Sequence, residues 1–280
     1  MHLAEGTLPL NQALLWSAVA APTVAWSLRG EQLAQKEEAS SSLVMAGATS
    51  LLFAGTLLPL PVPVVGATSH ICLTQVLGLL VGTRRIVWPT FLVLLTQAIF
   101  FAHGGITTLG VNTITLGFVG PVCAAALWGL FRRLGLSSAI GLGVACALGG
   151  LSVYLADAAV LAVALSDAAP PIATFLAVIL GFAPVQVPLA VIEAFSSAAM
   201  VRVLATRRPD LIVHSLRNLR KQSISGATVI VVVCSALGGS ACHYEGIDGS
   251  VFGATAESTG HPPTDSVIAS PSSPWLRSMM

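Results

Sequence analysis

The chain has 280 residues, of which 55% are hydrophobic and only 9% are charged, and its formal net charge is +1. Soluble domains carry roughly 25% charged residues, so this composition excludes a water-soluble protein. The balanced charge also excludes the basic face that a nucleic-acid-binding protein needs. Apolar stretches of about 20 residues recur along the chain, and each is long enough to cross ~30 Å of hydrocarbon. We therefore predict a polytopic membrane protein built from helices.

The hydropathy pattern predicts an all-α bundle of about seven membrane helices plus an eighth C-terminal span. The expected spans lie near residues 10–28, 43–60, 64–83, 86–103, 112–131, 138–165, 171–205 and 225–241. Twelve of the thirteen basic residues fall in alternate loops, and only Arg277 falls on the other side. By the positive-inside rule these loops are cytoplasmic, which places the N-terminus outside the cell membrane.

Two of the spans are expected to be irregular. Pro61 and Pro63 lie at the outer end of the third span, and Pro184 and Pro188 interrupt the seventh. Proline breaks a helix because it lacks a backbone donor and clashes with the preceding turn. Broken helices at membrane depth persist where they line a cavity, so both breaks predict an internal site.

Sequence motifs argue against an enzyme. The chain has no P-loop, so it is not expected to bind or hydrolyse ATP by itself. It also has no H-E-x-x-H or G-x-S-x-G motif, which leaves metalloprotease and serine hydrolase without support. The five cysteines are scattered and form no C-x-x-C pair, which favours small packing residues over a zinc site.

A histidine in position two offers a chelating peptide. The Met1 α-amine, the His2 amide and the His2 imidazole can close two adjacent rings on one metal ion. Three nitrogens in a plane suit Ni(II), Cu(II) or Co(II), and a fourth corner needs another donor. His70 is the candidate, because an imidazole within a span is costly unless it lines a cavity or has a partner. Gly6 and Pro9 permit the N-terminus to turn back toward it.

Other polar residues within the spans are candidates for supporting the ligands through hydrogen bonds, or for satisfying freed backbone groups. They are Ser69, Gln97, His103, Asn112 and Glu193. A rival hypothesis is a secondary metal permease that relays protons through His103, Asp157 and Glu193.

Four ordered sequence blocks resemble the CbiM/NikM family, the cobalt/nickel substrate-binding components of energy-coupling-factor transporters. The start Met-His-Leu-Ala-Glu-Gly-Thr-Leu-Pro is similar to the family's N-terminus, and residues 61–70 are similar to its Pro-Ser-x-x-Gly-Ser-x-Ser-His. Residues 97–121 and the run Gln186–Glu193 are similar to two further signatures. One departure is Ile71-Cys72-Leu73, where the family has Pro-Thr-Gly.

The resemblance implies seven helices, an extracytoplasmic N-terminus and metal held by Met1, His2 and His70. It further implies uptake of Co(II), for example for cobalamin synthesis, across a prokaryotic cell membrane, with a scaffold transmembrane subunit and ATP-binding subunits as partners. Ni(II) is the alternative cargo, because intrinsic affinity rises from cobalt to nickel.

Two domains are expected. Residues 1–210 form the metal-binding membrane component, and residues 222–280 form a span followed by an acidic extracytoplasmic tail. This second part resembles the first half of the transporter's small accessory membrane subunit, which is therefore also a candidate partner.

Overall fold

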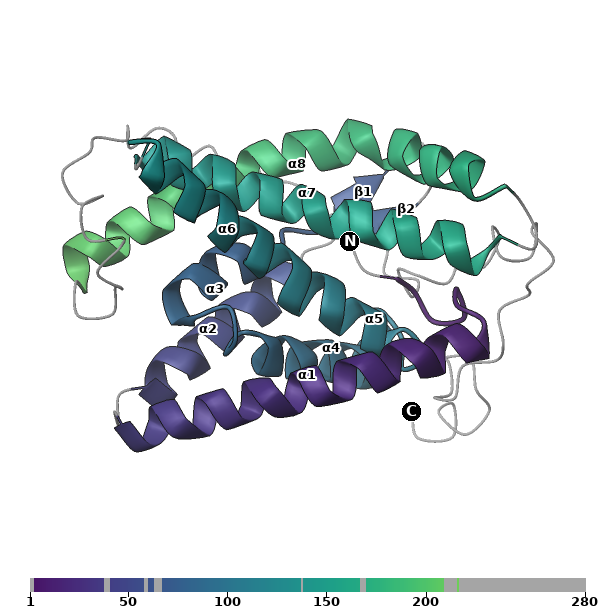
Figure 1. Cartoon of the computed structure of the whole chain (residues 1–280), viewed down its shortest axis with the longest axis horizontal. Coiled ribbons are helices and arrows are strands. Elements are labelled where there is room, and N and C mark those ends of the chain that lie inside the picture. The colour runs from purple at the N-terminus through teal and green to yellow at the C-terminus, as the bar shows by residue number, and fades with distance from the viewer. Residues whose placement is uncertain are drawn as a thin grey trace, which may run out of the picture.

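The computed structural model describes residues 3–37, 41–57, 60–62, 67–136, 138–166, 170–208 and residue 216. Counted with α5, a π-helical turn and α6 as one continuous helix, these residues contain seven helices, which confirms the all-helical fold. The expected eighth span, 225–241, lies outside the described residues. Figure 1 shows α7 and α8 along one side of the molecule and α1 along the opposite side, with the shorter helices between them.

The first two helices are α1, Leu10–Glu37, and α2, Ser41–Thr56. α1 extends nine residues beyond the predicted span and includes the arginine and lysine that follow it in the sequence. Its apolar side chains are largely exposed, for example Leu10 at 70% and Leu14 at 63%. Large exposed apolar faces of this kind suit contact with lipid.

The third predicted span is not a single helix. Its outer part is a hairpin of two antiparallel strands, β1 (Leu60–Val62) and β2 (Ala67–Ser69), and only α3 (Thr74–Val81) is helical. The predicted irregularity is confirmed, but its form differs from a kinked helix. Pro61 lies within β1, where a residue with fixed φ and no donor is tolerated at an edge. His70 consequently precedes α3 and does not lie on it.

The middle of the chain follows the predicted spans closely. α4 covers Val87–Phe100, and the next crossing consists of α5 (Leu109–Ile114), the π-helical turn η1 (Thr115–Val119) and α6 (Gly120–Arg133). The π-turn is a wide turn of the kind that often occurs at functional sites. α7 covers Ala139–Ala164 and packs mainly against α6 and α8.

The prediction that the seventh span is broken is wrong. α8 is one continuous helix, Pro171–Arg207, with Pro184 and Pro188 inside it. Each proline removes one backbone hydrogen bond, and packing along α7 supports the helix past both positions. The structure therefore supplies a long rigid element where the sequence predicts a cavity-lining break.

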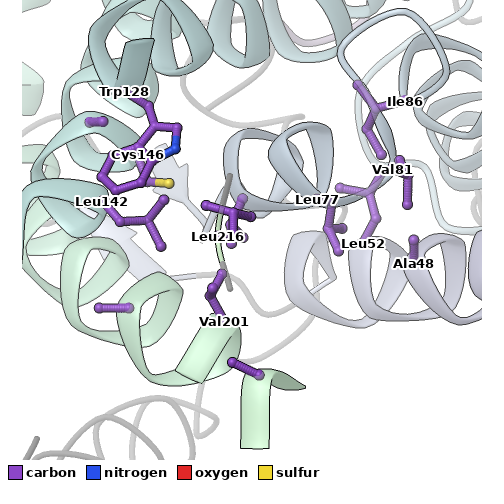
Figure 2. Packing of buried hydrophobic residues seen from close by; sticks show 14 of the residues in the cluster. Ala48, Leu52, Leu77, Val81, Ile86, Trp128, Leu142, Cys146, Val201 and Leu216 are labelled. Atoms are coloured by element: carbon purple, nitrogen blue, oxygen red, sulfur yellow. The ribbon is translucent and has the colours of Figure 1, made fainter. Parts of the chain in front are cut away.

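The hydrophobic core gathers near one end of the bundle. Figure 2 shows Leu52 and Leu77 packed together on one side, and Leu142, Cys146 and Val201 on the other. This is the end of the molecule where α6 and α8 terminate in Arg133 and Arg207, and we call it the basic end (left in Figure 1).

A partly buried ion pair fixes the corner between α1, α2 and α4 at this end. Arg85 Nη2 lies 2.7 Å from the Glu31 carboxylate and also donates to Ser41. Ser27 accepts from the Trp88 N–H at 2.8 Å and donates to the Arg85 carbonyl at 3.2 Å. We call Ser27, Glu31, Ser41 and Arg85 the basic corner. It ties the start of α4 to the first two helices.

The chain is a membrane protein by the length and composition of its helices. Three described helices are long and apolar enough to cross a bilayer: the continuous helix Leu109–Arg133, α7 and α8. Two shorter apolar helices are α2 and α4. With the hairpin and α3, these elements surround a set of buried polar side chains.

Candidate metal centre

His70 lies in the short connection between β2 and α3 and is almost fully buried, with 2% of its surface exposed. α8 holds this connection on both sides of the histidine. Ser69 Oγ donates to Gln186 Oε1 at 2.8 Å, and the Cys72 N–H donates to Glu193 Oε1. Gln186 and Glu193 are seven residues apart, about two helical turns, so they lie on the same face of α8. The backbone around His70 is therefore clamped to one helix.

The residues after His70 bring a thiol beside the ring. Cys72 is buried, and its Sγ lies 3.9 Å from His70 Nδ1. The other neighbours of this thiol in its cluster are apolar side chains, among them Leu94 and Leu116. The run Ile71-Cys72-Leu73 departs from the Pro-Thr-Gly of the pattern that the sequence resembles, so the wall beside His70 differs from that pattern.

His103 faces His70 from the loop that joins α4 to α5. The two ring centroids are 5.8 Å apart in an edge-to-face arrangement. The His103 N–H donates to the Gln97 carbonyl at 3.2 Å, and the Gln97 side chain donates to Thr56 at 2.7 Å. His103 is buried, with 3% of its surface exposed, so its ring lies against His70 out of contact with solvent.

The N-terminal segment folds into the bundle. Leu3 is fully buried, its N–H donates to Asn112 Oδ1 at 2.7 Å, and its carbonyl accepts from Asn112 Nδ2 and Thr108 Oγ1, both at 2.8 Å. One asparagine thus satisfies both backbone groups of Leu3, as a neighbouring strand would. This confirms that the chain turns inward before α1, as Gly6 and Pro9 permit.

The same loop that carries His103 also grips Glu5. The Thr107 N–H donates to Glu5 Oε2 at 3.2 Å. Gly105 allows this approach, because a Cβ there would lie 2.6 Å from Glu5 Cα, a distance that real contacts do not show. The N-terminal segment and the His103 loop therefore form one packed unit, and His103 in turn contacts His70.

The structure brings several of the predicted site residues together, and other predicted residues lie outside its described part. Ser69, His103 and Glu193 contact His70 or its backbone neighbours, Asn112 holds the N-terminal segment, and Gln97 supports His103. Met1 and His2 lie outside the described residues. Within the described ranges, no three His, Cys, Asp or Glu side chains are grouped so as to hold a metal ion.

Sequence reasoning named Thr108 as a residue that can orient its neighbours by hydrogen bonds, but it did not identify the partner of Thr108 or of Gln186. Gln186 bonds Ser69, and Thr108 bonds Leu3. Both lie inside sequence blocks that resemble family signatures, so the sequence did indicate that these segments matter. The pairing partner of each residue is 105 or more positions away, and a single sequence does not reveal it.

Comparisons with known proteins agree on one family. The profile described as "Cobalt uptake substrate-specific transmembrane region" (CbiM) matches residues 2–211. The cobalt transport protein CbiM of Geobacter sulfurreducens is 36% identical over 212 residues, which is 76% of this chain and 61% of that relative's length. The CbiM of Sorangium cellulosum is 34% identical over 212 residues, which is 76% of this chain and 94% of the relative.

Solved structures show the same fold. A crystal structure of a truncated transition metal transporter aligns with a TM-score of 0.65 at 20% identity, covering 74% of this chain and 99% of that one. The structure titled as a transition metal transporter gives the same TM-score at 19% identity. The family is one of transport proteins, which agrees with the prediction that the chain is not an enzyme. From the profile match over residues 2–211 and these relatives, the chain belongs to the CbiM family of cobalt uptake substrate-specific transmembrane regions.

Proposed function

We propose that this chain is the substrate-binding membrane component of an energy-coupling-factor transporter that imports Co(II), for example for cobalamin synthesis. The names of the relatives from Geobacter sulfurreducens and Sorangium cellulosum support cobalt as the cargo. The observation that carries the proposal is the buried Leu3, held by Asn112 and Thr108 against the loop whose His103 faces His70.

The proposed ligands are four nitrogens. They are the Met1 amine, the His2 amide, the His2 imidazole and the His70 imidazole, in a planar arrangement. Leu3 is fixed inside the bundle by Asn112, which supports a ligand role for the two residues that precede it in the sequence. The clamp from Gln186 and Glu193 sets the position of the fourth ligand.

Around these ligands, hydrogen bonds from neighbouring side chains keep the geometry ready before the metal arrives. Ser69 and Glu193 act on the backbone next to His70, while Asn112 acts on Leu3. His103 and Gln97 form the wall on the other side. A ligand that is already ordered loses less conformational entropy on binding, which favours tight capture of a dilute ion.

The transport scheme places the N-terminus outside the cell and the basic end in the cytoplasm of a prokaryote, in a chain that crosses the membrane several times. The arginines at the basic end support this orientation through the positive-inside rule. Proposed partners are a scaffold transmembrane subunit, ATP-binding subunits and a small accessory membrane subunit. The accessory-like part, residues 222–280, lies outside the described residues.

The decisive experiment extends the N-terminus. Adding Gly-Ser ahead of Met1 leaves every side chain in place but converts the terminal amine into an amide. The loss of one ligand of four is expected to weaken Co(II) binding about a hundredfold or more. The matched control is Gly-Ser added after Met280, and the intact mass of both proteins establishes which residue starts the purified chain.

Full retention of Co(II) binding and uptake by the N-terminally extended chain would contradict the proposed ligands. The same preparations decide the cargo. Elemental analysis of the parent purified from medium with equal Co(II) and Ni(II) is expected to find cobalt in excess, and nickel in excess would make this chain a nickel importer with the same site.

A further inference from the structure

An aspartate on α7 is buried without a partner. Asp157 has 0% of its surface exposed. Neither of its carboxylate oxygens has a hydrogen-bond partner among the described residues. Buried polar groups normally have partners, and an uncompensated charge inside a protein is strongly unfavourable. The packing of the helices alone therefore gives no reason for a carboxyl group at this position.

The neighbours of Asp157 along α7 show where it lies. Val153, four residues before it, belongs to the packed cluster that contains Cys72. Leu161, four residues after it, belongs to the cluster that contains Leu3. Residues four apart lie on the same face of a helix. Asp157 is therefore placed between the connection that carries the proposed fourth ligand and the N-terminal segment.

The π-helical turn η1 packs against this part of α7. Thr115 of η1 is 1% exposed, and its side chain faces the Asp157 carboxylate. Its hydroxyl, however, donates to the Asn112 carbonyl at 3.5 Å. The Asn112 side chain is bonded to Leu3. The polar groups on this helix thus serve the N-terminal segment, and the carboxylate beside them is left without a hydrogen bond.

The second buried carboxylate lies nearer the basic end. One oxygen of Glu193 accepts from the Cys72 N–H, and the other lies where a Cβ on Gly150 would overlap it. Gly150 precedes Asp157 by seven residues, which is about 10 Å along the helix. Because α7 begins one short loop after Arg133, Asp157 is farther from the basic end than Glu193 is. The two carboxylates therefore adjoin different parts of the region around the proposed fourth ligand.

The proposed capture site is positively charged when it is loaded. Co(II) brings two positive charges, and the His2 amide contributes one negative charge when it gives up its proton to solvent and binds. The amine and the two imidazoles bind as neutral groups, so the net charge is +1. A charge within a membrane-spanning bundle is costly unless an opposite charge lies near it.

We propose that Asp157 is the counter-charge of the loaded capture site. This inference rests on the proposed function and adds a residue to it that acts through its charge and does not bind the metal itself. Leu3, whose cluster includes the residue one turn after Asp157, directly follows the two proposed ligand residues in the sequence. The carboxylate has no partner in the described part of the chain because its partner arrives with the cargo.

The test removes the charge and then restores it from another helix. Asp157→Asn keeps the shape of the side chain and removes its charge. The exchanged chain, Asp157→Thr with Thr115→Asp, places the carboxylate on η1 facing the same space. Glu31→Gln, which neutralises a carboxylate at the basic corner, is the matched control. Co(II) affinity, the thermal midpoint of the apoprotein and the visible absorption of the Ni(II)-saturated chain are measured in detergent.

Asp157→Asn is expected to bind Co(II) about tenfold or more weakly, because the loaded site is left with an uncompensated charge. The thermal midpoint is expected to stay close to the parent's, and the Ni(II) absorption bands are expected to keep their positions because the ligands are unchanged. The exchanged chain is expected to regain affinity to within about threefold of the parent. Glu31→Gln is expected to bind Co(II) as the parent does.

Parental Co(II) affinity in Asp157→Asn would overturn the proposal and leave Glu193 as the balancing carboxylate. Shifted Ni(II) bands would also overturn it, because Asp157 would then be a ligand. An exchanged chain that folds like the parent but stays weak would show that shape matters at this position and charge does not. Parental binding with lost uptake in cells that express the partner subunits would assign Asp157 to a later step. Failure of the proposed function gives another pattern, in which the parent itself binds no Co(II).

Discussion

Two groups of polar side chains between the helices differ in whether they have hydrogen-bond partners. At the basic corner, Glu31 pairs with Arg85, and Arg85 also donates to Ser41. On α3 and α8, by contrast, the Gln75 amide and one oxygen of Glu193 have no partner within the described part of the chain. Both regions lie between helices, but Arg85 is partly exposed, whereas Glu31, Gln75 and Glu193 are buried.

Paired and unpaired buried groups have different consequences for the protein. A buried ion pair with added hydrogen bonds fixes one arrangement of helices, since breaking it leaves an uncompensated charge. Unsatisfied polar atoms cost stability, and water or a ligand normally supplies the partner that the protein does not. The basic corner therefore holds the helices in place, while the surroundings of His70 are where we propose that the cargo binds.

The largest expected effect is on the cargo side. His70→Ala removes one of four proposed ligands, so Co(II) affinity is expected to fall about a hundredfold or more while the thermal midpoint of the apoprotein stays close to the parent's. Isothermal titration and a thermal melt in detergent measure the two quantities. His261→Ala, in the acidic tail, is the control. Parental affinity in His70→Ala would move the fourth ligand elsewhere, with His103 as the next candidate.

A smaller effect is expected at the segment that delivers the N-terminus. Asn112→Leu keeps the approximate size of the side chain and removes its two hydrogen bonds to Leu3. Each such bond contributes about 1 kcal/mol, so affinity for Co(II) is expected to fall about tenfold or somewhat more. Titration beside Thr96→Val, which removes an exposed hydroxyl bonded only within its own helix, gives the comparison. Equal affinities would show that Leu3 stays in place without Asn112.

The smallest expected effect on Co(II) affinity is at the basic corner, where a substitution changes stability instead. Glu31→Gln neutralises the partner of Arg85, whose side chain is 23% exposed and therefore partly hydrated. A loss of about 2 kcal/mol of stability is expected, seen as a lower thermal midpoint, with unchanged Co(II) affinity. Glu37→Gln, at the exposed end of α1, is the control. A change in affinity without a change in stability would erase the distinction between the two regions.

The two irregular spans show where sequence reasoning stops. Proline in the third span correctly predicted a departure from helix, yet whether that departure is a kink or a hairpin depends on how Leu60 pairs with Ser69. Proline in the seventh span predicted a break that α7 prevents by packing along α8. The same residue type thus had different outcomes, because its effect depends on the neighbouring elements.

The sequence by itself determined the membrane class and the helix count within the described residues, since hydropathy and charge are local properties that act over one helix. It also placed Asn112 and Glu193 among the candidates. Only the tertiary structure decided which residues meet: Leu3 with Asn112 across 109 positions, and Cys72 with Glu193 across 121. Such contacts depend on the packing of whole helices, which no local pattern encodes. For the same physical reason, only the structure shows that Gln75 lies against three glycines of α6 and α7.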